Sequence, residues 1–288
     1  MKLIVDSGST KAAWYVALPG SMSFMIRTAG INPVRDDLDA MRAVVGGARV
    51  SVESELVLGR ASSLGQMLRF SHVYFYGAGC IPPYSGSLCS LLQEVFPEAE
   101  VAVESDLLGA ARALCGHAEG IACILGTGAN SCLYDGRDIA RQTPALGWIL
   151  GDEGSGAVLG RLFMNGIFKN PRLADIRDQY LAETKMTQAD IIKKVYREPM
   201  ANRFLASTST FIISHLDNPI IHQLVVDNFR QFFRSNIEPY GHKDLPVHFV
   251  GSMSFHYHSQ LEEAAQKEGY VIGQTMQSPM EGLIAFHA

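Results

Sequence analysis

The sequence has few cysteines, and no two of them form a CxxC pair. The five cysteines lie at positions 80, 89, 115, 123 and 132 of a chain of 288 residues. An odd number of cysteines at such scattered positions argues against a disulfide framework and against a structural zinc site. We therefore expect reduced thiols that serve as small core residues, as in a cytoplasmic protein.

Long apolar runs and runs of basic residues are absent as well. No apolar stretch approaches the ~20 residues that a membrane-spanning helix needs. The apolar run near the N-terminus is only Leu3–Val5 and meets Asp6 at once, which argues against a signal peptide. The net charge is −5 and no Lys/Arg cluster stands out. We therefore expect neither a nucleic-acid partner nor a membrane partner.

Several motifs of known chemistry are also missing. The sequence holds no GxxxxGK[ST], so a P-loop nucleotide site is excluded, and no GxGxxG follows a predicted strand, so dinucleotide binding has no support. Neither GxSxG nor HExxH occurs. A serine hydrolase of the α/β type and a zinc protease therefore have no support either.

What the sequence does contain is an alternation of strand and helix patterns, which predicts an α/β fold. The predicted strands are residues 2–5, 12–17, 22–26, 72–76, 101–103, 120–125, 131–134, 247–250 and 270–272. The predicted helices are residues 35–46, 87–95, 106–115, 258–267 and 280–286, with a mostly helical region over 153–240. The length allows two lobes of ordinary domain size. We expect an N-terminal lobe over 1–116, a C-terminal lobe over 117–272, and a closing segment over 273–288 that packs back on the N-terminal lobe.

Two turns of small residues follow buried strands at matching places, about 120 residues apart. The first is Asp6–Lys11 (DSGSTK) and the second is Gly126–Gly128 (GTG). Backbone N–H groups and hydroxyls in such turns can hold phosphate oxygens, and a neighbouring carboxylate can hold Mg²⁺ through water. Each turn alone could equally be a plain hairpin turn. Together, the two indicate a polyphosphate held from both sides.

Four blocks carry a resemblance to a known family: Asp6–Lys11, Glu104–Ala110 (ESDLLGA), Ile124–Asn130 (ILGTGAN) and Leu146–Ser155 (LGWILGDEGS). They resemble the N-acetylglucosamine kinase branch, grouped with the BadF/BadG/BcrA/BcrD-type ATPases, of the superfamily of sugar kinases, heat-shock chaperone ATPases and actin. The resemblance implies a two-lobed, actin-like ATPase fold of the ribonuclease H-like type, with a cleft between the lobes.

The resemblance also implies roles for individual residues, with ATP and Mg²⁺ as cofactors. Asp106 is implied as the catalytic base that contacts the sugar, and Asp6 as the residue near Mg²⁺. The implied nucleotide-binding residues are Asp6, Gly8, Ser9, Thr10, Lys11, Gly126, Thr127 and Gly128, with Gly251 and Ser252 on the adenosine side. The implied sugar-binding residues are Asn32, Asp106, Asn130, Gly147, Trp148 and Asp152.

Structural roles compete with several of these assignments. Asp106 could cap a helix, with Ser105 as the other candidate cap. Asp152 could favour a helix start through the helix dipole. Trp148 could be a core residue, and Asn32 could be a turn residue before Pro33.

The sequence departs from the family pattern at Ser7 and Ser9, which stand where the family usually has glycine. It also departs at Ser252, which stands where the bacterial branch often has a second glycine. We expect the first two changes to leave function intact and to alter ATP affinity. The change at Ser252 bears on the nucleotide preference.

The function that the resemblance implies is transfer of the γ-phosphate of ATP to the 6-hydroxyl of an amino sugar, with N-acetylglucosamine as the first candidate. Glucosamine and N-acetylmuramic acid are alternative substrates. An ATPase activator of a radical dehydratase and a catalytically silent sugar-binding regulator are alternative functions. The resemblance further implies a homodimer.

Overall fold

The computed structural model describes residues 1–8, 10–18, 22–58 and 69–288. Contacts between residues divide the chain into two compact units. Unit 1 comprises Met1–Gly116 together with Pro279–Ala288, and unit 2 comprises His117–Ser278. Among the described residues, no helix is long and apolar enough to cross a membrane.

Unit 1 is built on a five-stranded sheet in the order β3-β2-β1-β4-β5. The strands are β1 (Lys2–Ser7), β2 (Lys11–Ala17), β3 (Phe24–Ala29), β4 (His72–Gly77) and β5 (Glu100–Ser105). β1 pairs antiparallel with β2, and β2 pairs antiparallel with β3. On its other side β1 pairs parallel with β4, which pairs parallel with β5.

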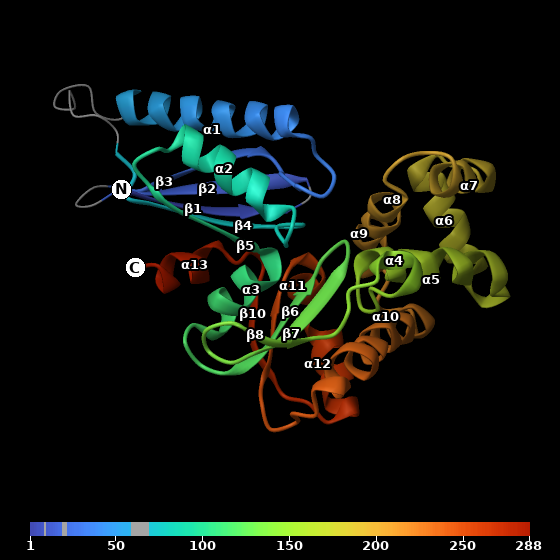
Figure 1. The fold of residues 1–288 in the computed structure, drawn as a ribbon. Coiled ribbons are helices and arrows are strands. Elements are labelled where there is room, and N and C mark those ends of the chain that lie inside the picture. The colour runs from blue at the N-terminus through green and yellow to red at the C-terminus, as the bar shows by residue number, and fades with distance from the viewer. Residues whose placement is uncertain (9, 19–21, 59–68) are drawn as a thin grey trace. The chain divides into compact units, whose positions relative to one another are not determined.

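Helices cover both faces of this sheet, as Figure 1 shows. They are α1 (Leu38–Leu58), α2 (Ser85–Val95), α3 (Asp106–Cys115) and α13 (Met280–Phe286). Leu3 and Val5 point to the core that includes buried residues of α1 and α2. Ile4 points the other way and packs with Met280 and Leu283 of α13. The alternation along β1 therefore matches a strand buried on both faces.

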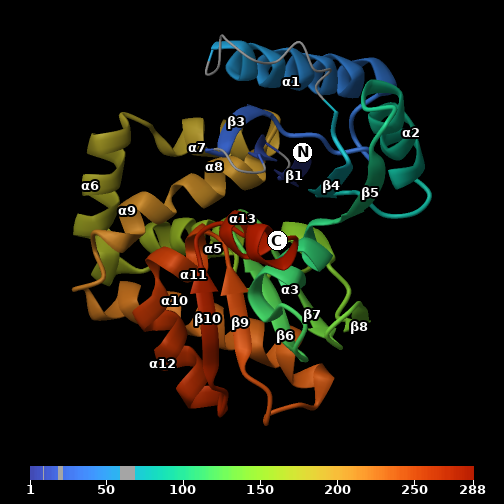
Figure 2. The same ribbon diagram turned by 90° about the vertical axis from the view of Figure 1, so that its left-hand side faces the viewer.

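Unit 2 repeats the same topology. Its strands are β6 (Gly120–Leu125), β7 (Ala129–Tyr134), β8 (Ile139–Gln142), β9 (Val247–Val250) and β10 (Ile272–Met276). They lie side by side in the order β10-β9-β6-β7-β8 (Figure 2). β6 pairs antiparallel with β7 and parallel with β9, as β1 does with β2 and β4. The repeated strand–turn–strand pattern in the sequence thus reflects two sheets of one design.

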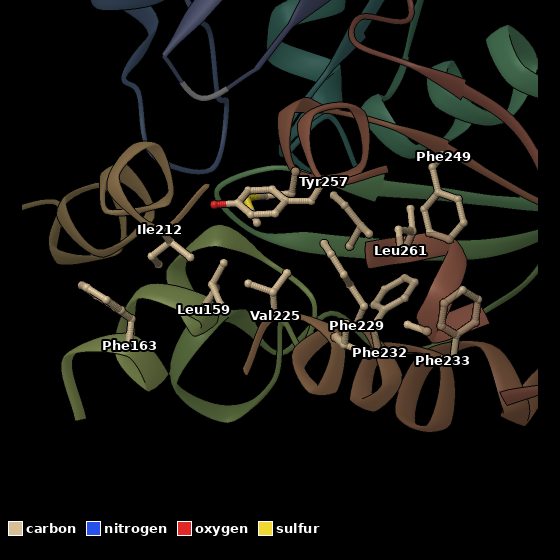
Figure 3. Packing of buried hydrophobic residues seen from close by; sticks show 14 of the residues in the cluster. Leu159, Phe163, Ile212, Val225, Phe229, Phe232, Phe233, Phe249, Tyr257 and Leu261 are labelled. Atoms are coloured by element: carbon tan, nitrogen blue, oxygen red, sulfur yellow. The ribbon is translucent and has the colours of Figure 1, made fainter. Parts of the chain in front are cut away.

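The helices of unit 2 form a large aromatic core with this sheet (Figure 3). They are α4 (Gly147–Leu150), α5 (Gly156–Lys169), α6 (Ala174–Thr184), α7 (Gln188–Tyr196), α8 (Ala201–Ser207), α9 (Ser209–Ile213), α10 (Pro219–Phe232), α11 (Ser252–His256) and α12 (His258–Glu268). Phe229 and Phe232 of α10 are fully buried in this core, as is Phe249 of β9. Asn218 caps α10 and Pro219 is its first residue, as the Asn-Pro pair predicts.

Several boundaries differ from the expectations, among them the end of α1, the last strand and the closing segment. α1 extends to Leu58 instead of ending near 46, because Gly46 and Gly47 lie within the helix without breaking it. The last strand is Ile272–Met276 and not 270–272. Because β10 belongs to the sheet of unit 2, residues 273–278 lie in unit 2, and the part of the chain that packs on unit 1 begins at Pro279.

Gly47 offers a simple test of α1. It is exposed within the helix, and a Cβ built on it would meet no atom within 4 Å. Because glycine in a helix interior costs about 0.5–1 kcal/mol relative to alanine, Gly47→Ala should raise the free energy of unfolding by that amount. Urea denaturation followed by circular dichroism measures the change, and a loss of stability would contradict the helical assignment at this residue.

Candidate functional site

The first turn of unit 1 lies between β1 and β2, at the end of the central strand of the sheet. Asp6 is partly buried, whereas Gly8, Thr10 and Lys11 are exposed. Ser9, the remaining predicted nucleotide-binding residue of this turn, lies outside the described residues. The turn therefore presents backbone groups, a hydroxyl and an ammonium to solvent beside the Asp6 carboxylate, which is a chemistry suited to phosphate.

Asp106 is the first residue of α3 and directly follows β5. Ser105, not Asp106, is the N-cap: its Oγ accepts a hydrogen bond from the Leu108 N–H at 3.1 Å. The Asp106 Oδ1 accepts a bond from the Leu107 N–H at 2.9 Å. Burial raises the pKa of the Asp106 carboxyl, although the Leu107 bond opposes the shift. The helix start is thus already capped without Asp106.

Asp6 and Asp106 form a pair of electrostatically coupled carboxyl groups within unit 1. Burial is the main cause that raises the pKa of Asp6 to about 6, and the charge of Asp106 raises it further. The same charge adds to the burial that raises the pKa of the Cys80 thiol to about 12. Cys80 is a neighbour of this pair that sequence reasoning assigned only to the core. A carboxylate whose charge is disfavoured by a second carboxylate fits a site that binds a cation.

Asn32 lies in a tight turn after β3. Its backbone N–H donates to Asp36 Oδ2 at 2.8 Å, and its Oδ1 accepts from the Val34 N–H at 3.0 Å. Its side chain also covers the backbone of Gly79, where a Cβ would lie 2.2 Å from Asn32 Oδ1. The Asn32 side chain therefore takes part in a turn and lies against the loop that follows β4.

The second small-residue turn joins β6 and β7 in unit 2 and is bonded to the start of α5. The Gly156 N–H donates to Gly126 O at 2.9 Å, and the Ala157 N–H donates to Thr127 O at 3.1 Å. Thr127 itself is exposed. These bonds fix the turn to a helix N-terminus, whose partial positive charge favours an anion nearby.

Asp152 lies against the same turn. A Cβ on Gly128 would be 3.0 Å from Asp152 Oδ2, and the Asp152 carboxylate accepts a bond from the backbone of Ala129. Burial raises the pKa of the Asp152 carboxyl, although the hydrogen bond from Ala129 acts to lower it. Its φ of 56° is a left-handed value that is uncommon for a residue other than glycine, so the surrounding structure holds Asp152 in place.

Buried Asn228 supports the segment that carries Asp152, and sequence reasoning missed it. Its Oδ1 accepts from the Gly154 N–H at 3.1 Å, and its Nδ2 donates to Ser155 O at 3.4 Å. Ser155 then caps α5. In the sequence, the only indication of such a role is that Asn228 is a polar residue within the apolar face of the helix that begins at Pro219.

The other predicted sugar-binding residues of unit 2 lie on two segments. Asn130 is partly buried in β7, and its Oδ1 accepts bonds from the Ser131 N–H at 3.0 Å and from Gln142 Nε2 at 3.1 Å. Gly147 begins α4 with a φ of 74° and is exposed. Trp148 is partly buried and packs against the hydrophobic core of unit 2.

Gly251 directly follows β9 and caps α11, and Ser252 begins α11 with an exposed side chain. The Gly251 backbone approaches β6 so closely that a Cβ would lie 2.3 Å from Leu125 O. Since Leu125 directly precedes Gly126, the turn at Gly251 and the second small-residue turn lie beside each other in unit 2. The structure therefore brings together Gly126–Gly128, Asp152 and Gly251 in one unit, and Asp6, Asn32 and Asp106 in the other.

Comparisons with known proteins define the family. No protein-family model matches the sequence, and a search of curated proteins finds no match. Among solved structures, a Porphyromonas gingivalis protein described as a "putative N-acetylglucosamine kinase" is 45% identical, with a TM-score of 0.85 over 100% of this chain and 98% of that chain.

Two more distant structures share the fold. A Chromobacterium violaceum protein with the same description is 14% identical, with a TM-score of 0.71 over 100% of this chain and 98% of that one. The Spiroplasma citri MreB 5 structure is 11% identical, with a TM-score of 0.52 over 99% and 94%. With two α/β units of matching topology and 45% identity over its full length, the chain belongs to the N-acetylglucosamine kinase-like family and has an actin-like ATPase fold.

Proposed function

We propose that this protein is an ATP-dependent sugar kinase that transfers the γ-phosphate of ATP to the 6-hydroxyl of an amino sugar, with N-acetylglucosamine as the first candidate. The observation that carries the proposal is the Asp6–Asp106 carboxyl pair, in which Asp106 begins a helix that Ser105 already caps. A partly buried carboxylate that is not needed as a cap is available for chemistry. The P. gingivalis relative's description supports the choice of substrate.

The residues of unit 1 suit the acceptor side of phosphoryl transfer. Asp106 would accept the hydroxyl proton at its carboxylate as the phosphate is transferred. Its raised pKa brings the carboxyl closer to the range in which a general base is effective at neutral pH. The 6-hydroxyl of a hexose is a primary alcohol that projects from the ring, so a single carboxylate can reach it without crowding the ring.

The residues of unit 2 suit the binding of phosphate and sugar hydroxyls. The backbone of Gly126–Gly128, bonded to the start of α5, would hold phosphate oxygens. Asp152 would accept hydrogen bonds from the hydroxyls of the sugar, and the Asn130 amide would donate them to the sugar. Because phosphoryl transfer depends on positioning and charge neutralisation, a rigid turn contributes directly to the rate.

The donor set around Asp6 fits Mg²⁺. Among the described residues, no group of three or more His, Cys, Asp and Glu side chains could hold a metal ion. A single carboxylate fits Mg²⁺ nonetheless, because this ion keeps several waters and takes further oxygens from the phosphates. When bound, Mg²⁺ neutralises phosphate charge. It would also relieve the unfavourable coupling between Asp6 and Asp106.

The alternative of a radical-dehydratase activator is less well supported. Such an activator holds an iron–sulfur cluster through cysteines of two subunits. Here three of the five cysteines are buried and the other two, Cys89 and Cys115, are only partly exposed. Cys123 and Cys132 lie in the neighbouring strands β6 and β7 with no exposed surface. An iron assay on protein purified without oxygen tests this alternative directly.

The test of the proposed function is ADP release from MgATP in the presence of N-acetylglucosamine, glucosamine, N-acetylmuramic acid or glucose. Strong stimulation by one amino sugar supports the proposal and identifies the substrate, and mass spectrometry of the product locates the phosphate. ATP hydrolysis that no sugar stimulates would contradict it.

Asp6→Asn should weaken the response to Mg²⁺ with little change in the KM for the sugar. The wild-type response should also depend on pH, because a proton and Mg²⁺ compete for the same carboxylate. With a pKa of about 6 for Asp6, the carboxyl is protonated below that pH, so the Mg²⁺ concentration for half-maximal rate should rise about tenfold from pH 8 to pH 5. In Asp6→Asn this rise should disappear, and a rise of equal size in the variant would remove Asp6 from the metal site.

A further inference from the structure

We propose that Ser7 is a positioning residue that sets the place of Asn32, and through it the binding of the sugar. The inference rests on the proposed function, because it takes Asn32 as a sugar-binding residue. Ser7 is the last residue of β1, directly after Asp6, and its side chain is fully buried. Its hydroxyl is therefore directed into the protein and away from any phosphate at the turn.

The path of the chain after β3 creates the need for such a residue. β3 is the edge strand, and β2 separates it from β1. To reach the end of β1, residues 30 and 31 must cross over the turn that joins β1 and β2. Gly30 makes this crossing, because a Cβ on it would lie 2.0 Å from Gly8 O and 2.8 Å from the Thr10 backbone nitrogen. Only glycine allows so close a passage.

The Ser7 hydroxyl then fixes the chain where it arrives. Its Oγ accepts a hydrogen bond from the Ile31 N–H at 2.9 Å and donates to Ile31 O at 3.2 Å. Ile31 is fully buried. Without the Ser7 hydroxyl, the backbone N–H and C=O of Ile31 would lose this hydrogen-bond partner in the protein interior, where an unpaired polar group is costly. One side chain thus replaces the pairing that a neighbouring strand would otherwise supply.

The same residue joins a third loop to the site. The Ser7 carbonyl accepts a bond from the Ala78 N–H at 2.9 Å, in the loop that follows β4. The next residue of that loop, Gly79, lies under the Asn32 side chain, with Asn32 Oδ1 2.2 Å from the position of a Cβ. Asn32 is therefore held from two sides, by the chain at Ile31 and by the loop at Gly79. Ser7 is hydrogen-bonded to both of these segments.

This arrangement revises the effect expected of Ser7. The sequence comparison with the family, in which glycine usually stands at this position, suggested altered ATP affinity. The hydroxyl instead bonds the segment that carries Asn32, and a glycine there could not make these bonds. We therefore expect Ser7 to act on the sugar more than on the nucleotide.

The test is a kinetic comparison of wild type with Ser7→Ala, using the sugar that stimulates ADP release most. We expect the KM for the sugar to rise about tenfold or more and the KM for ATP to change less than about twofold. Thr208→Val is the matched control, because Thr208 is also a buried hydroxyl that bonds a backbone carbonyl, that of Leu205, and lies outside the proposed site. The control should leave both constants unchanged.

A double-mutant cycle decides whether Ser7 acts through Asn32. If it does, the KM of Ser7→Ala/Asn32→Ala should equal that of Asn32→Ala alone. Additive effects, or an unchanged KM for the sugar in Ser7→Ala, would overturn the inference. Ser7→Gly carries the same test if Ser7→Ala does not fold.

Hydrogen exchange provides a readout that does not need activity. Loss of the Ser7 hydroxyl should speed exchange of the Ile31 amide by about tenfold or more, and unchanged exchange would overturn the inference. If wild type phosphorylates no sugar, the proposed function fails while the exchange result still tests the link between Ser7 and Ile31. If wild type is active and the Ser7 variants keep a normal KM for the sugar, only this inference fails.

Discussion

Asp106→Asn is expected to lower kcat by about 10²- to 10⁴-fold, the range that a general base contributes, while the KM for the sugar changes little. Asparagine has nearly the shape of aspartate, and its side-chain oxygen can still accept the bond from the Leu107 N–H that Asp106 Oδ1 accepts at 2.9 Å. It cannot accept the proton of a sugar hydroxyl. The rate should therefore fall because the base is lost and not because α3 moves.

The pH profile gives this prediction a second readout. Because burial raises the pKa of Asp106, the carboxyl holds its proton to a higher pH than an exposed aspartate does. A base is active only when deprotonated, so wild-type activity should decline on the acidic side as the pH falls through the raised pKa. The residual rate of Asp106→Asn should lack the part of this decline that Asp106 causes.

Ser105→Ala is the matched control on the same helix end. It removes the hydroxyl that accepts from the Leu108 N–H, so it should lower the free energy of unfolding by about 1 kcal/mol. Asp106→Asn should show the opposite pattern, with a large loss of rate and a small change in stability. If Asp106→Asn destabilised the protein as a lost cap does and kept near-normal turnover, the structural role would be the correct one.

The sequence predicted the features that depend on local pattern. Buried strands stood out as apolar runs, and the two small-residue turns after β1 and β6 revealed the duplication that the matching sheets confirm. The Thr187–Asp190 capping box and the Asn218 cap have the residue types and spacing that are typical of helix starts, and both are present. β8 was missed because its sequence, IARQ, alternates poorly and three of its four residues are exposed.

The features that escaped the sequence depend on contacts between distant segments. The role of Asn228 requires that α10 lie under Gly154, 74 residues earlier. The bonds of Ser7 require that residue 31 cross the sheet end, which no local pattern encodes. Asp6 and Asp106 were each singled out from motifs, but their coupling appears only once β1 and β5 lie in one sheet. Sequence patterns thus identified the proposed chemical groups, and the fold supplied the residues that hold them.

Gly251→Ala is expected to be among the most destabilising single substitutions in unit 2, at about 2–6 kcal/mol. Gly251 has a φ of 126° and a ψ of 166°, a region that essentially only glycine adopts, which costs another residue about 1–3 kcal/mol. In addition, the new Cβ would lie 2.3 Å from Leu125 O, so β6 and β9 would have to separate, at a further cost of about 1–3 kcal/mol. The displaced Leu125 leads directly into Gly126–Gly128, so the KM for ATP should rise at least tenfold where the variant still folds.

Gly241→Ala separates the two causes. Gly241 also has a left-handed φ, of 77°, but a Cβ there would meet no atom within 4 Å. It should therefore lose only about 1–2 kcal/mol, the cost of the left-handed conformation, and it should keep a normal KM for ATP. Urea denaturation of both variants, with ATP kinetics on the folded protein, makes the comparison. Equal losses in the two variants would mean that the contact between Gly251 and Leu125 contributes nothing. A larger loss confined to Gly251→Ala, together with a raised KM for ATP, would show that the close approach of Gly251 to Leu125 holds the second small-residue turn in place.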